Sequence, residues 1–154
     1  MSSFQIFNDR QILSLRKGGK VLRDCLTQTA ERVRPGIDTG ALDLFAEDFI
    51  RSHAGATPAF KGYHGFPATL CISINEQCVH GIPGKRVIEE GDIVSLDGGV
   101  IYDDLYTDAC ITVPAGAVPP NVRNGTDSLI ASTTRAPAIP NDLRVSSCAQ
   151  TPPY

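Results

Sequence analysis

The chain of 154 residues has no tryptophan, and its aromatic residues make up only 6% of the total. No apolar run approaches the roughly 20 residues that a membrane-spanning helix needs. The N-terminus, MSSFQIFNDR, lacks the charged and then apolar pattern of a secretory leader. We therefore expect a cytoplasmic protein with no membrane partner.

Basic residues are not in excess, because 14 Lys and Arg face 17 Asp and Glu, which gives a net charge of −3. This balance argues against nucleic acid as a partner, since such binding needs a basic surface. None of the five cysteines forms a CxxC pair or another zinc or redox spacing. With 42% hydrophobic residues, the chain has enough apolar side chains for one core.

The last part of the chain has a different composition. No histidine follows His80, no glutamate follows Glu90, and no lysine occurs from Ala115 onward. Seven of the 11 prolines lie at or after Pro114. Such a composition is typical of irregular or linker-like segments, so we expect an irregular tail over 117–154.

Before the tail, the pattern predicts an α+β domain with two helices covering a sheet. Apolar residues recur at threes and fours over 11–33, although the glycines at 18 and 19 are expected to interrupt that helix. A second helix is expected from Thr39, as N-cap, to about His53, where His53 caps the end. A loop rich in glycine, proline and aromatics follows, and then a strand over 69–74.

The segment from Asp92 to Pro114 predicts a β-hairpin with its turn at 103–104. In that register Asp97 faces position 110 and Asp108 faces position 99. Asp97 and Asp108 then share one face as diagonal neighbours, roughly 7–8 Å apart at the backbone. Two carboxylates at this reach can hold divalent ions, although they can equally be polar residues on a solvated face.

Two histidines, His64 and His80, lie upstream in loops rich in glycine and proline. A lone histidine is more often structural than catalytic. Two of them ahead of a carboxylate pair make chemistry an equal alternative, because an imidazole can donate to a peptide carbonyl or take a proton near neutral pH.

Five segments in order resemble the type I methionine aminopeptidases: GYHGFP at 62–67, ATLCISINE at 68–76, VHGIPG at 79–84, EEGDIVSLDGGVIYDD at 89–104 and TDACITVPAG at 107–116. The resemblance extends over roughly residues 4–116. It implies the pita-bread fold, with residues 1–116 forming the N-terminal half of the catalytic domain. It also implies removal of the N-terminal methionine from nascent polypeptides by a dinuclear metal site.

The resemblance assigns roles residue by residue. Asp97 and Asp108 match two metal ligands for a pair of divalent ions, which would be Co, Mn, Fe or Zn. His80 matches the catalytic histidine that contacts the substrate near the scissile peptide. Tyr63, Phe66 and Cys71 match the pocket for the methionine side chain, and His64 has a supporting role. Association with the ribosome is a further implied property.

The sequence departs from the family pattern in its ligand set. The family uses three further ligands, a histidine and two glutamates, and none can follow in this chain after His80 and Glu90. One hypothesis is therefore a truncated or frame-shifted aminopeptidase. A second is a non-catalytic module that keeps the methionine pocket and binds peptide N-termini. A third, weaker hypothesis is a structural metal-binding domain, which leaves the histidine loops unexplained.

Overall fold

The computed structural model describes residues 6–120, so most of the expected tail lies outside the described part of the chain. The described elements in chain order are α1 (Asp9–Ala30), α2 (Thr39–Arg51), β1 (Ala56–Pro58), a 3-10 turn (Tyr63–Gly65), β2 (Leu70–Ile74), β3 (Ile93–Tyr102) and β4 (Leu105–Pro114).

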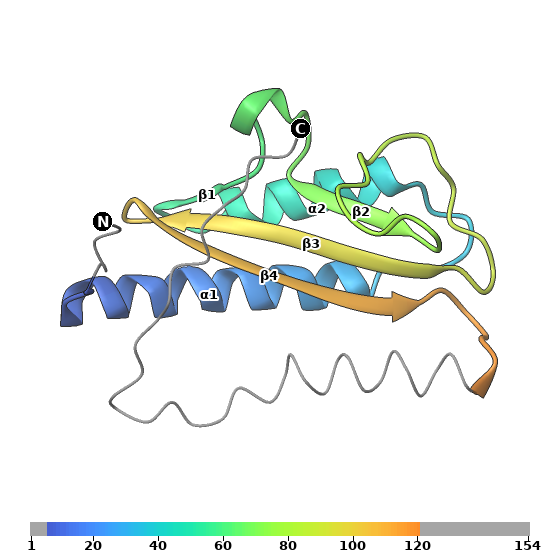
Figure 1. Cartoon of the computed structure of the whole chain (residues 1–154), viewed down its shortest axis with the longest axis horizontal. Coiled ribbons are helices and arrows are strands. Elements are labelled where there is room, and N and C mark those ends of the chain that lie inside the picture. Colours follow the sequence, from blue (N-terminus) through green and yellow to red (C-terminus); the bar gives the residue numbers. More distant parts are fainter. Residues whose placement is uncertain (1–5, 121–154) are drawn as a thin grey trace, which may run out of the picture.

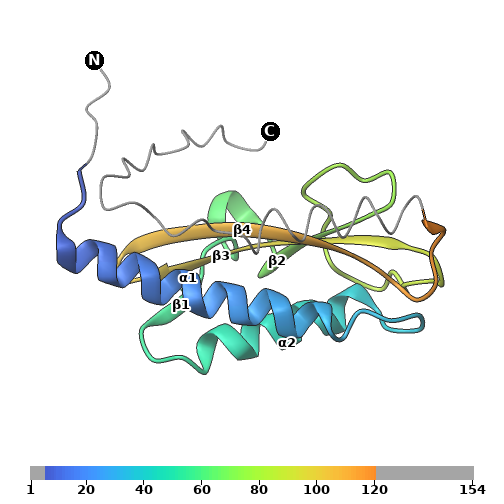
Figure 2. The ribbon, with the colours of Figure 1, turned by 90° about the horizontal axis from the view of Figure 1, so that it is seen from below.

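The architecture has two layers, with both helices packed on one face of an antiparallel sheet (Figures 1 and 2). β3 is the central strand. One of its edges pairs with β4 along the whole length, and the other pairs with β2 and then β1, which lie end to end. The predicted α+β class with two covering helices is therefore confirmed.

The first helix begins at a capping box. Asn8 Oδ1 accepts from the backbone N–H of Gln11, and the Gln11 side chain accepts from the N–H of Asn8. The expected interruption at residues 18 and 19 is wrong, because α1 continues through both. A Cβ at Gly18 would lie 3.2 Å from Tyr102 Cβ. The glycine therefore lets the helix approach the hairpin closely.

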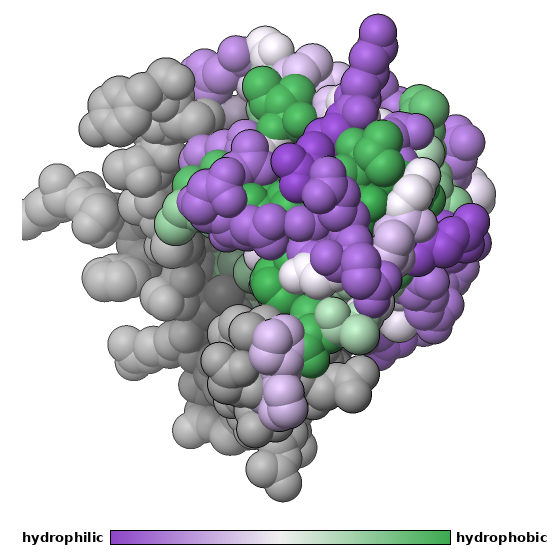
Figure 3. All heavy atoms as spheres, turned by 90° about the vertical axis from the view of Figure 1, so that its right-hand side faces the viewer, coloured by the Kyte–Doolittle hydropathy of each residue, from purple (hydrophilic) through white to green (hydrophobic). Residues whose placement is uncertain are grey.

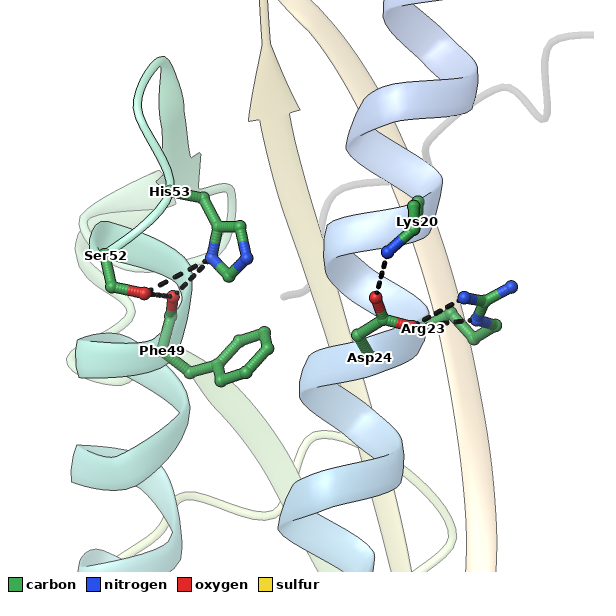
Figure 4. Close-up of polar contacts among 6 residues, drawn as sticks. All are labelled: Lys20, Arg23, Asp24, Phe49, Ser52 and His53. Carbon is green, nitrogen blue, oxygen red and sulfur yellow. Dashed lines mark hydrogen bonds and ion pairs between the residues drawn. The ribbon is translucent and has the colours of Figure 1, made fainter.

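The second helix confirms one expected cap and corrects the other. Its N-cap is Asp38, whose carboxylate accepts from Ala41 N–H at 2.8 Å, while the hydroxyl of Thr39 bonds to Gly84. The sequence pattern allows either Asp38 or Thr39 as the cap. Because the Thr39 hydroxyl bonds to Gly84 instead, the Asp38 side chain caps the helix. At the other end, His53 Nδ1 lies 2.9 Å from the carbonyl oxygen of Phe49, as expected (Figure 4).

The core lies between the helices and the inner face of the sheet. Alternate residues of β3 face the helices and are fully buried, as the period of a strand requires. The largest fully buried side chains are Leu22, Leu26, Leu42, Ile50, Leu70, Ile88, Leu96, Val94 and Val100. Burying apolar side chains of this size stabilises a fold by roughly 1.5–3 kcal/mol each.

The hairpin has the predicted register, with Asp97 opposite Cys110 and Gly99 opposite Asp108. Asp103 and Asp104 form its turn with φ values of 49° and 60°. Two successive positive φ values are typical of the turn that matches the twist of a hairpin. Ser14 Oγ donates to Asp103 Oδ2 at 2.6 Å, which ties the turn to α1.

The opposite end of the molecule contains the loops between β2 and β3 (Figure 1). Hydrophilic side chains cover most of its described surface, with hydrophobic atoms between them (Figure 3). Among the apolar side chains of these loops, Val79 and Ile82 are more than half exposed. Neither helix in residues 6–120 is long and apolar enough to cross a membrane.

Gly81 provides a test of this packing. Its carbonyl accepts from Ile72 N–H at 2.8 Å, and a Cβ at Gly81 would lie 2.1 Å from the Ile72 carbonyl oxygen. We expect Gly81→Ala to lower the free energy of unfolding by roughly 2–4 kcal/mol, because backbone must move. Urea unfolding followed by circular dichroism measures this change.

Gly84→Ala is the matched control, because no atom lies within 4 Å of its added Cβ. This variant should change stability by less than about 0.5 kcal/mol. Equal losses for the two glycines would show that the close approach at Gly81 does not matter.

Candidate functional site

Asp97 and Asp108 lie together on the outer face of the sheet, away from the helices. The neighbouring Gly98 defines the inner face, since a Cβ there would meet Leu22 and Leu70. Side chains alternate along a strand, so Asp97 points to the other face, and the register gives Asp108 the same face. The predicted pairing of the two carboxylates is therefore present in the fold.

Both carboxyl groups have raised pKa values. Burial and the neighbouring Asp108 carboxylate raise the pKa of Asp97 to about 6, while the charge of His80 acts in the opposite direction. Burial also raises the pKa of Asp108. Two half-buried carboxyl groups, one of which raises the pKa of the other, are costly without a cation, and such groups cluster at functional sites.

Two thiols flank the carboxylates. Cys71 on β2 and Cys110 on β4 are the two register partners of Asp97, so the three residues form a row across the sheet. Burial, followed by the charges of Asp97 and Asp108, raises the pKa of Cys71 to about 12 and also raises that of Cys110. Both thiols are free. Cys110 was not singled out from the sequence, although its place opposite Asp97 follows from the predicted register.

Asp43 of α2 fixes the start of β2, the strand that carries Cys71. Its Oδ1 accepts from the backbone N–H of Thr69 at 3.0 Å and of Leu70 at 2.7 Å, at the start of β2. Burial raises the pKa of Asp43, and these two hydrogen bonds act against that rise. The second helix therefore fixes the strand that carries Cys71.

The loop between β1 and β2 folds over the outer face beside the carboxylates. Ala59 N–H donates to the Gly99 carbonyl at 3.0 Å, and a Cβ at Gly99 would lie 3.0 Å from Phe60 Cε1. Gly99 therefore permits this loop to approach the strand. The short strand β1, which precedes this loop, was not predicted, because three residues with one proline give too short a pattern.

The aromatic residues predicted to line a pocket lie on this loop. Tyr63 and His64 make an edge contact at 4.4 Å between ring centroids, and His64 has a φ of 46°. Phe66 is half-buried and donates its backbone N–H to the Tyr63 carbonyl, whereas Tyr63 is 43% exposed. Tyr63 and Phe66 therefore share one turn, and Cys71 lies on the adjoining strand.

His80 reaches the site from the loop that follows β2. Gly81, the next residue, bonds to both Ile72 and Ser73 of β2, and this pairing fixes the loop. His80 has a φ of 59°, a conformation that is uncommon for a residue with a side chain. Its charge acts on Asp97, so the fold brings His80 towards the carboxylate pair.

Asp97 and Asp108 have the donor chemistry that divalent cations prefer. Paired carboxylates in a half-buried position suit such ions, because the charge of a cation removes their mutual repulsion. Within residues 6–120, however, no group of three or more His, Cys, Asp and Glu side chains converges to hold a metal. Asp97 and Asp108 therefore fit as one part of a donor set.

The fold is that of a class of metallopeptidases. The model of metallopeptidase family M24 matches residues 14–136, more than half of the chain, and the protein belongs to this family. Its relatives are methionine aminopeptidases. That of Clostridium perfringens is 50% identical over 111 residues, which are 72% of this chain and 44% of that protein. That of Helicobacter pylori is 45% identical over 118 residues, 77% of this chain and 46% of that protein.

Solved structures give the same assignment. Methionine aminopeptidase from Rickettsia prowazekii superposes with a TM-score of 0.78 at 31% identity, covering 84% of this chain and 52% of that one. Prolidase from Pyrococcus furiosus, at 19% identity and a TM-score of 0.70, shares the fold. The predicted half of a pita-bread fold is confirmed, and the chain spans about half the length of the curated relatives it matches.

The raised pKa of Asp97 gives a testable pH dependence. Its value rises from 3.8 to about 6 on folding, so the folded chain binds this proton more tightly than the unfolded chain does. The resulting stabilisation is present in acid and is lost as the pH rises from about 4 through about 6. Asp97→Asn removes the charge and should raise the free energy of unfolding at neutral pH by up to about 3 kcal/mol.

Urea unfolding of the metal-free chain across this pH range measures the effect. The gain of Asp97→Asn should shrink towards zero below pH ~4, where Asp97 is protonated in both states. Asp48→Asn, a change at an exposed position of α2, is the control and should show no such gain. A gain that does not vary with pH would contradict the raised pKa.

Proposed function

We propose that this chain contributes to the removal of N-terminal methionine from polypeptides by metal-assisted peptide hydrolysis. The observation that carries the proposal is the juxtaposition of Asp97 and Asp108, with His80 acting on Asp97, in a member of family M24. The similarity to methionine aminopeptidases supports the substrate, a nascent chain that begins with methionine.

Each residue has a role in this proposal. Asp97 and Asp108 would hold divalent ions, with Co, Mn, Fe or Zn as candidates, and such ions lower the pKa of bound water and polarise a carbonyl. An N–H of the His80 imidazole donates a hydrogen bond to the substrate peptide next to the scissile bond.

Tyr63, Phe66 and Cys71 surround the methionine side chain. Two aromatic rings and a protonated thiol suit an unbranched thioether, because all of them are weakly polar and polarisable. The raised pKa of Cys71 keeps this thiol neutral. His64, in edge contact with the Tyr63 ring, supports the position of that ring.

Hydrolysis requires ligands beyond these residues. Two carboxylates do not complete the coordination of two transition ions, and residues 6–120 offer no third converging donor. The proposal therefore assigns the described region the methionine pocket and one side of the metal site. A cytoplasmic setting and association with the ribosome are parts of the proposal that rest on the family resemblance alone.

A second candidate function is binding without hydrolysis. The small donor set within residues 6–120 favours it, because a pocket for methionine needs no metal. In this alternative, the chain holds peptide N-termini through Tyr63, Phe66 and Cys71.

The direct test is a chimera that joins residues 1–116 of this chain to the part of the Clostridium perfringens enzyme that it does not match. With Mn or Co added, we expect the chimera to release methionine from Met-Ala-Ser, and Asp97→Asn or Asp108→Asn to reduce the rate by at least about 100-fold. Asp48→Asn should leave the rate unchanged. A folded chimera that releases no methionine would contradict the proposal.

Peptide binding by the unaltered chain separates the two candidates. Calorimetry with Met-Ala-Ser is performed with Mn and then with EDTA. Binding that survives EDTA and is lost in Cys71→Phe, which fills the pocket, would favour the binding module. Binding that needs the metal and is lost in Asp97→Asn would favour the hydrolytic site.

A further inference from the structure

Charge is distributed unevenly between the first helix and the rest of the described chain. α1 contains five Lys and Arg and two Asp and Glu, which gives a net charge of +3. Residues 31–120 contain six Lys and Arg and 13 Asp and Glu, which gives a net charge of −7. The whole-chain balance, which argues against nucleic acid, therefore averages over two regions of opposite sign. A basic region on an acidic protein is typical of a surface that binds a polyanion.

Three of these basic residues form a stripe along the solvent side of α1. Arg16, Lys20 and Arg23, which we call the basic stripe, lie on one face of the helix, because residues three and four positions apart are neighbours there. All three are exposed, and the side chains of Lys20 and Arg23 are exposed by 69% and 68%. At a rise of about 1.5 Å per residue, the stripe covers about 10 Å along the helix axis.

Asp24 fixes the positions of two cations of the basic stripe (Figure 4). Lys20 Nζ donates to Asp24 Oδ2 at 2.7 Å, and Arg23 Nη2 donates to Asp24 Oδ1 at 2.6 Å. An ammonium has three N–H donors and a guanidinium has five, so both groups keep donors for the oxygen atoms of a partner. One carboxylate balances only part of the charge of the stripe, and Arg16 has no ion-pair partner within residues 6–120.

The basic stripe and the carboxylate pair lie on opposite sides of the sheet. Both helices cover one face of the sheet (Figure 2), and α1 buries Leu22 and Leu26 in the core between them. The stripe is on the opposite side of α1 from these leucines, whereas Asp97 and Asp108 lie on the other face of the sheet. A partner that binds the stripe therefore leaves the carboxylate face accessible.

We propose that the basic stripe binds the phosphate backbone of a double-stranded nucleic acid. A duplex carries one phosphate per roughly 1.7 Å of its axis, so a segment as long as the stripe offers more phosphates than three cations need. Guanidinium and ammonium groups donate charge-assisted hydrogen bonds to phosphate oxygens. The negative charge of residues 31–120 repels the same backbone, which orients the protein with α1 towards it. The proposal is independent of the hydrolysis proposed above, because it depends on the charges of α1 alone.

Two other anionic partners suit the basic stripe less well. A helix that binds lipid inserts a wide apolar face, whereas the apolar face of α1 is buried in the core of the protein. An interface with an acidic protein usually has an apolar centre, and the large exposed aliphatic residues of α1, Ile12 and Leu13, lie at its N-terminal end, before the stripe. A nucleic-acid backbone needs only the cations, because its contacts are hydrogen bonds and ion pairs.

The test is binding of the full chain to a fluorescent RNA duplex, measured by anisotropy between about 50 and about 200 mM KCl. Each phosphate contact releases counterions, so the logarithm of the association constant should fall with the logarithm of the salt concentration with a slope of about −3. A DNA duplex of the same length should also bind, because the contacts are to phosphates and not to bases.

Arg16→Gln and Arg23→Gln each remove one of the proposed contacts. Each should weaken binding to the RNA duplex roughly fivefold at low salt and reduce the magnitude of the slope by about 1. Arg51→Gln is the matched control, because it removes the same charge from an exposed arginine of α2 that pairs with Glu47 as Arg23 pairs with Asp24. This control should leave the affinity and the slope unchanged, and a cooperative melt confirms that each variant is folded.

The absence of binding to the RNA duplex at about 50 mM KCl would overturn the proposal. Equal losses in Arg23→Gln and Arg51→Gln would overturn the location of the site on α1. Poly-glutamate, and vesicles of phosphatidylglycerol and phosphatidylcholine in equal parts, are the competing probes. If either probe bound more tightly than the RNA and lost binding in Arg16→Gln, the stripe would be a site for an acidic protein or a lipid surface, and the assignment to nucleic acid would be wrong.

Discussion

Ten consecutive residue pairs join β3 to β4, and this ladder determines where the chemistry of the protein lies. It places Asp97 and Asp108 on one face, while Leu96, Gly98 and Val100 face the helices. A shift by one residue would exchange the two faces, burying the carboxylates in the core and exposing Leu96. The core and the carboxylate pair therefore depend on the same register, and the contact of Ser14 with the turn helps to hold it.

The paired carboxylates lower the stability of the fold. Burial raises the pKa values of both carboxyl groups, and the Asp108 carboxylate raises that of Asp97 further, while the charge of His80 offsets only part of the rise at Asp97. Close contacts around them, such as the loop over Gly99 and the pairing of Gly81 with β2, keep the groups in place. A protein that accepts such a cost within an otherwise consistent fold usually does so for function, in agreement with its membership of family M24.

The outer face of the sheet is subject to a second constraint. A two-layer sheet with helices on one side leaves its other side open unless something else covers it. The matched region makes up about half of each of these relatives, and within residues 6–120 neither helix covers the outer face of the sheet. The carboxylate pair lies on that face, which links completion of the fold to completion of the site.

The sequence by itself determined the hairpin, its turn, the register and the common face of Asp97 and Asp108. These follow from local rules: the period of two, the turn residues, and the apolar pattern of each strand. Tertiary structure alone decided the continuous path of α1 through Gly18, the capping by Asp38, the short strand β1, and the approach of His80 to Asp97. Each of these depends on contacts between segments far apart in the chain. Local propensity cannot predict such contacts, because it depends only on neighbouring residues.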